Sequence, residues 1–94
     1  MPDQFEMSLF MECIKQVSAK LGDEESIIQI RKGRTRPGRQ VFHYYKVDVG
    51  ILDKSLQDAP KGRRSLIVAM NQDSPSTADI SPAGWEPWDH IYGD

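Results

Sequence analysis

The chain has 94 residues, enough for one small domain that buries somewhat over ~60% of the surface its unfolded form exposes. Its 38% hydrophobic and 28% charged residues exclude wholesale disorder. The formal net charge is only −2, but the charges are segregated: residues 1–30 carry two Lys or Arg against six Asp or Glu, residues 31–64 carry ten against three, and residues 65–94 carry none against five. Such charge segregation is informative about binding partners rather than about the fold, and it predicts that the middle third contacts an anion.

The N-terminal sequence lacks the basic and apolar regions of a signal peptide, and no apolar run approaches the ~20 residues of a membrane span. The single cysteine, Cys13, cannot form an internal disulfide, a CxxC redox pair or a zinc site. We therefore expect a cytoplasmic protein that does not contact membranes and uses no metal or other cofactor.

An amphipathic helix is predicted near the N-terminus. Its apolar residues recur at the spacing of one helical face: Phe5, Leu9, Phe10, Cys13, Ile14, Val17 and Leu21. Asp3, with Glu6 three residues later, resembles a capping box. Gly22 is expected to end the helix in the left-handed conformation.

Three strands are predicted after the helix. The Ile-rich residues 26–32 form the first, the sequence GRTRPG at 33–38 forms a turn, and the alternating residues 40–52 form the second. A polar connection over 53–64 leads to a third strand at 65–71. This order predicts an α+β fold in which the helix packs on a three-stranded antiparallel meander, α-β-β-β, within residues 1–72.

The pairing of the first two strands is predicted from their apolar faces. If Ile30 pairs near Val41 and Ile28 near His43, the apolar faces of the two strands coincide. The opposite face then holds Gln29, Arg31, Gln40, Phe42 and Tyr44. Gly50 is expected to mark a bulge or bend late in the second strand.

The final segment, 73–94, is predicted to be an irregular acidic tail. It contains three Pro, four Ser or Thr and no basic residue. Its large aromatic side chains predict order against the domain or a partner: Trp85, Trp88 and Tyr92.

Catalysis is not expected. Cys13 and His43 fall on apolar faces and are predicted to be core residues, and His90 beside Asp89 resembles an ordinary surface pair. The sequence contains no GxSxG, GxGxxG, Walker or HExxH motif.

The candidate binding residues are mainly basic and aromatic. The predicted hairpin carries five cations: Arg31, Lys32, Arg34, Arg36 and Arg39. Guanidinium groups suit bidentate contact with phosphate or carboxylate. A second basic cluster, expected at the opposite end of the sheet, consists of Lys61, Arg63 and Arg64. Between them, the outer face of the second strand carries Phe42, Tyr44 and Lys46.

Two functions fit these residues. The first is a non-enzymatic protein-interaction module, an adaptor, inhibitor or regulator, whose basic hairpin meets an acidic partner surface and whose Trp-containing tail occupies a groove. The alternative is a nucleic-acid-binding module in which arginines contact the phosphates of DNA or RNA and Phe42 and Tyr44 stack on bases. A third interpretation is a solvated basic turn that prevents edge-to-edge aggregation, and the tail could also fold back over the aromatic residues.

Overall fold

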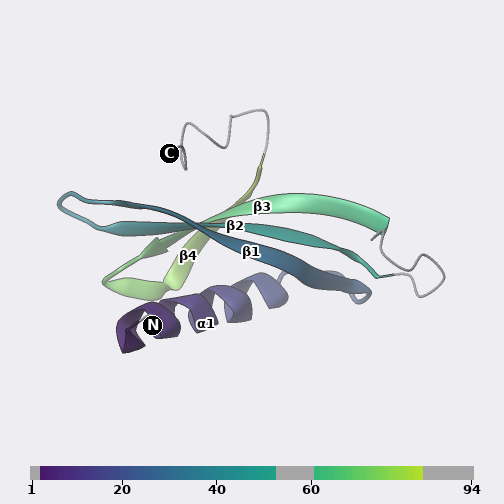
Figure 1. Cartoon of the computed structure of the whole chain (residues 1–94), viewed down its shortest axis with the longest axis horizontal. Helices are drawn as coiled ribbons and strands as arrows, with labels where there is room; N and C mark the ends of the chain where they lie inside the picture. The colour runs from purple at the N-terminus through teal and green to yellow at the C-terminus, as the bar shows by residue number, and fades with distance from the viewer. Residues whose placement is uncertain (1–2, 53–60, 84–94) are drawn as a thin grey trace.

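The computed structural model describes residues 3–52 and 61–83. Its elements are α1 (Gln4–Ser18), β1 (Glu25–Arg36), β2 (Phe42–Ile51), β3 (Lys61–Asn71) and β4 (Ser74–Pro82). The strands form one antiparallel sheet in the order β1-β2-β3-β4, and α1 lies across one face of it (Figure 1). The α+β class is therefore confirmed. Among the described residues, the helix is too short and too polar to cross a bilayer.

The number of strands is four, so the prediction of three was wrong. Strand β4 lies within the segment that was predicted to be irregular. Its residues Ala78 and Ile80 lie two positions apart, so both side chains face the core and pack against it. This apolar face was not recognised because most residues of the segment are polar. Pro75 and Pro82 lie near its ends, where a missing backbone donor interrupts little pairing. The residues from 84 onward, including Trp85, Trp88 and Tyr92, lie outside the described part of the chain.

Helix α1 begins as predicted. Asp3 is the N-cap, and its Oδ1 accepts a hydrogen bond from the Glu6 backbone N–H at 2.8 Å. The predicted apolar face is also confirmed, because Leu9, Cys13 and Val17 are buried against the sheet. This face is what anchors the helix.

The predicted helix end at Gly22 was wrong. The helix ends at Ser18, with Ala19 as the C-cap, and Gly22 has no positive φ. The Gly22 N–H instead donates to the Glu25 Oε1 at 2.9 Å. A side chain of β1 thus holds the turn, so a left-handed glycine is not needed.

The hydrophobic core lies between α1 and the inner face of the sheet, which we define as the face that α1 covers. Its buried members are Leu9, Cys13, Val17, Tyr45, Val47, Val49, Leu66, Val68 and Met70. Fully burying an aliphatic side chain of this kind contributes about 1.5–3 kcal/mol. Burial also raises the pKa of the Cys13 thiol to about 12, so this cysteine is the core residue that the sequence predicted and remains a thiol at neutral pH.

The predicted register of β1 on β2 was wrong. Ile30 pairs with Val47 instead of Val41, because the strand continues through Arg36, which pairs with Phe42. The extension passes an irregularity between Lys32 and Thr35. A second irregularity follows Ile27, which packs against the core in the role predicted for Ile28.

A bulge at Gly50 is confirmed. The pairing of β2 with β3 shifts between Val49 and Ile51, and Gly50 is fully enclosed. A Cβ atom at this position would lie 2.9 Å from the Ile28 Cδ1 and 3.3 Å from the Arg63 Cα. The close approach of the two neighbouring strands therefore requires glycine.

We predict that Gly50→Ala lowers the free energy of unfolding by about 1–3 kcal/mol, because the added methyl overpacks the site. Urea denaturation followed by circular dichroism measures this change. Gly22→Ala is the matched control, since its Cβ would meet only the Glu25 side chain, at 3.4 Å or more. Equal stability of the Gly50 variant and the unmodified chain would contradict the prediction.

Candidate anion-binding site on the outer face

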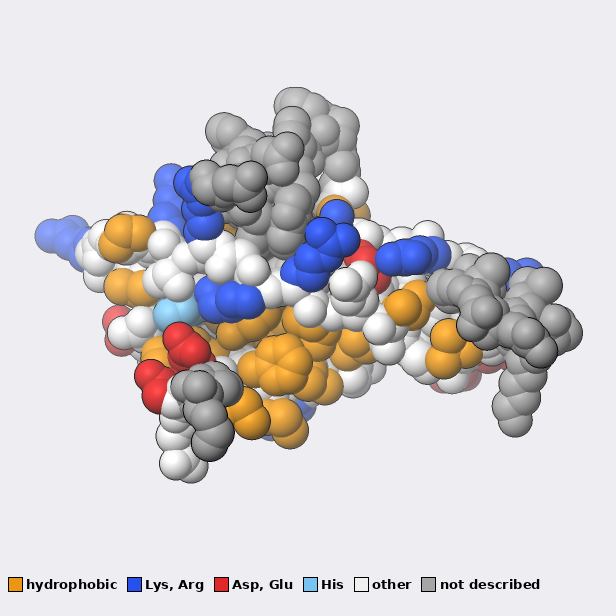
Figure 2. Space-filling view, viewed as in Figure 1, with side chains coloured by type: hydrophobic (Ala, Val, Ile, Leu, Met, Phe, Trp, Pro, Cys, Tyr) orange, Lys and Arg blue, Asp and Glu red, His pale blue; other side chains and the backbone are white. Residues whose placement is uncertain are grey.

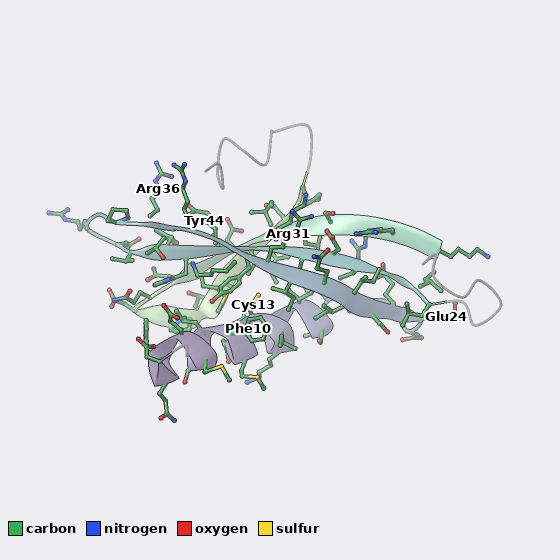
Figure 3. All side chains as sticks on the ribbon, viewed as in Figure 1. Phe10, Cys13, Glu24, Arg31, Arg36 and Tyr44 are labelled. Carbon is green, nitrogen blue, oxygen red and sulfur yellow. The ribbon has the colours of Figure 1, made fainter. Side chains whose placement is uncertain are left out.

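The outer face of the sheet, which is the face remote from α1, carries every second side chain of β2. The buried inward set is His43, Tyr45, Val47 and Val49. The pleat therefore places the other set on the outer face: Phe42, Tyr44, Lys46 and Asp48. Residues directly opposite in neighbouring strands share a face, so Arg36, opposite Phe42, and Arg31, opposite Lys46, lie there too. Figure 3 shows Arg31, Arg36 and Tyr44 on the other side of the sheet from Phe10 and Cys13.

A pocket of about 330 Å³ lies on this face at the tip of the β1–β2 hairpin. Three segments form it: the end of β1, the connecting turn and the start of β2. Its lining consists of Arg36, Pro37, Arg39, Gln40, Phe42 and Tyr44. Gly38, with a φ of 155°, makes the turn that brings the two arginines to the same pocket. We call this the hairpin pocket.

The hairpin pocket carries two positive charges. Both Arg36 and Arg39 are exposed, and within residues 3–52 and 61–83 neither guanidinium has an ion-pair partner. Phe42 and Tyr44 are half-buried, so each ring keeps some surface open to a ligand. The pocket thus combines two cationic forks with two aromatic rings, a combination suited to an anion that carries a flat group.

The second basic cluster lies at the opposite end of the sheet, as predicted, but within β3 instead of the connection before it. Lys61 pairs with Ile51, whereas Phe42, beside the hairpin pocket, pairs with Asn71 at the other end of β3. The predicted connection was too long because Lys61–Arg64 had been assigned to it. These residues extend the strand past the bulge at Gly50, where Gly62 has a φ of 64°.

Arg63 is held in an ion pair on the outer face. Its Nη2 donates to the Asp48 Oδ2 at 2.9 Å, and the Ser65 hydroxyl donates to the Asp48 Oδ1 at 2.6 Å. Desolvation by itself would raise the pKa of Asp48, but the hydrogen bonds from Ser65 and Arg63 outweigh it and hold this pKa below its usual value. The buried carboxylate therefore stays ionised and fixes Arg63.

Arg64 is also neutralised. It forms a two-point contact with Glu25, in which Nε and Nη2 each donate at 2.9 Å. Glu25 also accepts the Gly22 N–H, so one carboxylate links the helix–strand turn to β3. The hydrogen bonds from Arg64 and Gly22 lower the pKa of Glu25, and those to Glu25 raise that of Arg64. Arg63 and Arg64 thus have carboxylate partners, whereas Arg36 and Arg39 have none among the residues that the structure describes.

Lys32 also has a structural role, which separates it from the other predicted hairpin cations. It pairs with the inward-facing Tyr45, and its Nζ lies 5.2 Å from that ring centroid. The same ammonium donates to the Gly33 carbonyl at 3.1 Å, within the strand irregularity. Desolvation lowers the pKa of Lys32, and the charge of Glu6 opposes this shift. Lys32 therefore stabilises the inner side of the hairpin and does not face the pocket.

His43 is buried, as the sequence predicted. Its Nε2 lies 2.9 Å from the Gln72 Oε1, its Nδ1 lies 3.3 Å from the Thr35 Oγ1, and its ring meets Phe5 edge to face at 5.9 Å between centroids. These contacts tie the hairpin to α1 and to the turn before β4. Across the described residues, no group of three His, Cys, Asp or Glu side chains is placed to hold a metal ion.

Comparison of the chain with family models, curated proteins and solved structures gave no significant match. Functional inference therefore rests on the chain's own geometry. Sequence reasoning missed Pro37 and Gln40 as pocket residues, because it treated the turn only as a connection. A hairpin that extends to the pairing of Arg36 with Phe42 would have placed Pro37 and Gln40 in the turn beside these two residues.

We predict that Asp48→Asn lowers the free energy of unfolding at pH 7 by about 1–2 kcal/mol, a value reduced from that of a fully buried pair because Arg63 is half exposed. A lowered pKa means that the ionised Asp48 stabilises the fold above the ordinary Asp pKa of about 3.9, and that this contribution is lost as the pH falls through the lowered value. The difference between the variant and the unmodified chain should therefore shrink below about pH 4.

Urea denaturation from pH 7 to pH 3 measures this dependence. Asp79→Asn is the control, because Asp79 is an exposed carboxylate on the same face, opposite Ala69. A stability difference for Asp48→Asn that stays constant over the whole pH range would show that the carboxylate charge is not responsible.

Proposed function

We propose that the chain is a small non-enzymatic module that binds single-stranded nucleic acid on the outer face of its sheet. The observation that carries the proposal is the hairpin pocket, where two guanidinium groups without ion-pair partners in the described chain adjoin two aromatic rings. Arginine forks match phosphate oxygens, and aromatic rings stack on unpaired bases. The pocket volume of about 330 Å³ is at the small end for ligand sites, which suits one nucleotide unit.

The outward side chains of β2 continue the proposed binding surface beyond the hairpin pocket. Phe42, Tyr44 and Lys46 follow one another on the outer face, and Arg31 lies opposite Lys46 on the edge strand. A single strand lying along β2 would meet two rings and then a pair of cations. Bases that are paired in a duplex have their faces covered by their neighbours, so the rings favour an unpaired strand.

The negative total charge does not oppose this function, because several acidic residues of the described chain lie away from the hairpin pocket. Glu6 and Glu12 belong to α1, and Asp23 and Glu24 belong to the turn that follows it. Figure 2 shows Lys and Arg side chains along the sheet and Asp and Glu side chains near the N-terminal end of α1. The potential near the binding face depends on this local distribution more than on the net charge.

A protein-interaction module is the second candidate, and the position of β1 favours it. This strand is at the edge of the sheet, and no strand of the described chain pairs with its outer side. It carries Arg31, Arg34 and Arg36, so an acidic extended segment of another protein could add to the edge. Such cations also protect an edge from self-association. The contributions of Trp85, Trp88 and Tyr92, and the cytoplasmic location, stay predictions.

We predict that Arg36→Gln combined with Arg39→Gln weakens the binding of a labelled single strand of about 12 nucleotides, a length within the range of such sites. Two lost phosphate contacts should reduce the slope of log K against log salt by about 1.4. Fluorescence anisotropy at several salt concentrations measures this slope. The control with the same net charge, Lys20→Gln combined with Lys61→Gln, removes two exposed cations outside the pocket and should leave most of the slope unchanged.

We also predict that Phe42→Leu combined with Tyr44→Leu weakens the same binding by about 1–3 kcal/mol for each stacked base, with little change in the salt slope. A duplex of the same sequence and a poly-glutamate peptide serve as competing probes. Tighter binding of poly-glutamate than of the single strand would support the protein-interaction module. Single-strand binding that neither pair of substitutions alters would refute the hairpin pocket as the site.

A further inference from the structure

A second surface, independent of the hairpin pocket, lies on the exposed side of α1. Met7 and Met11 are 48% and 58% exposed, although large apolar side chains are usually covered when they lie together. They belong to a row with four-residue spacing, which begins at Asp3, continues through the two methionines and ends at Lys15. Figure 2 shows hydrophobic side chains gathered over this part of the molecule. We call this row the α1 ridge.

An open groove runs beside the α1 ridge. It is lined by Gln4, Met7, Ser8, Met11, Glu12 and Lys15. Three of these residues, Gln4, Ser8 and Glu12, form the adjacent row with the same spacing, so the groove separates two parallel rows of one helix. The short Ser8 side chain at its centre leaves space for a methionine from another helix. Rows of this spacing pack into each other's grooves in the commonest class of helix pair.

The charges on the α1 ridge identify the occupant. Asp3 lies at one end and Lys15 at the other, with Met7 and Met11 symmetric between them. A second α1 running antiparallel, about a two-fold axis between the methionines, would place Lys15 of each copy near Asp3 of the other and Met7 near Met11. This surface is therefore complementary to itself, as a two-fold interface requires. Among the described residues, Lys15 has no ion-pair partner within its own chain.

We propose that two copies of this chain associate through antiparallel pairing of their α1 ridges. A second copy carries the same two charges and the same two methionines, and in the antiparallel orientation these complement the α1 ridge. This pairing would not cover the hairpin pocket, because α1 lies on the other side of the sheet. The proposal does not depend on nucleic-acid binding. One helix pair is smaller than a standard interface, so association should be weak, with a dissociation constant of roughly 100 μM.

Sedimentation equilibrium of the intact chain over a range of protein concentrations tests the association. The mass-average mass should rise above 10.7 kDa toward twice that value as concentration increases. Met7→Gln combined with Met11→Gln, or Lys15→Glu alone, should abolish the rise while circular dichroism shows unchanged helix content. Leu52→Gln and Lys20→Glu are the matched controls, because they alter an exposed leucine and an exposed lysine outside the groove. A monomer at all concentrations, or a dimer insensitive to the ridge substitutions, would overturn the proposal.

Disulfide trapping tests the orientation of the pair. A chain with Met7→Cys mixed with a chain with Met11→Cys should give far more of the mixed cross-link under mild oxidation than either chain gives alone, since the antiparallel pair places position 7 near position 11. The buried Cys13 should not interfere, because its thiol stays protonated. A preference for links between identical positions would indicate parallel pairing and contradict the proposal.

Discussion

The burial of the inner face of β2 is the constraint on which the rest of this structure depends. The side chains of Tyr45, Val47 and Val49 are buried between the sheet and α1. A shift by one residue would expose all three and bury the charged side chain of Lys46, so the alternation is fixed by a large free-energy difference. The positions of Phe42 and Tyr44 on the outer face follow from this core and need no further interaction to specify them.

The same framework separates structural cations from cations available to a ligand. Asp48 and Glu25 each engage one arginine of β3, and Lys32 turns inward over Tyr45. These contacts connect β1, β2, β3 and the helix–strand turn. No corresponding carboxylate in the described chain meets Arg36 or Arg39. The basic middle third of the sequence therefore contains two kinds of positive charge, which a count of residues cannot distinguish.

The sequence predicted what depends on local periodicity. The buried face of α1, the N-cap Asp3 and the outward positions of Arg31, Phe42 and Tyr44 follow from spacings of three to four residues or of two. The strand register and β4 depend on distant contacts. Gly33 and Pro37 indicated an early turn, but the pairing of Arg36 with Phe42 extends the hairpin, and Ala78 with Ile80 was too short an apolar pattern to outweigh the surrounding Ser, Thr and Pro. Ion pairs such as Arg64 with Glu25, 39 residues apart, have no local sequence pattern.

Nuclear magnetic resonance provides the most direct test of the central claim that the outer face binds single-stranded nucleic acid. Uniformly ¹⁵N-labelled chain would be titrated with an unlabelled single strand, and the backbone amide shifts would be followed residue by residue. We predict concerted changes at Arg36, Arg39, Gln40 and Tyr44, with the amides of α1 unaffected. No shifts, or shifts confined to α1, would contradict the account.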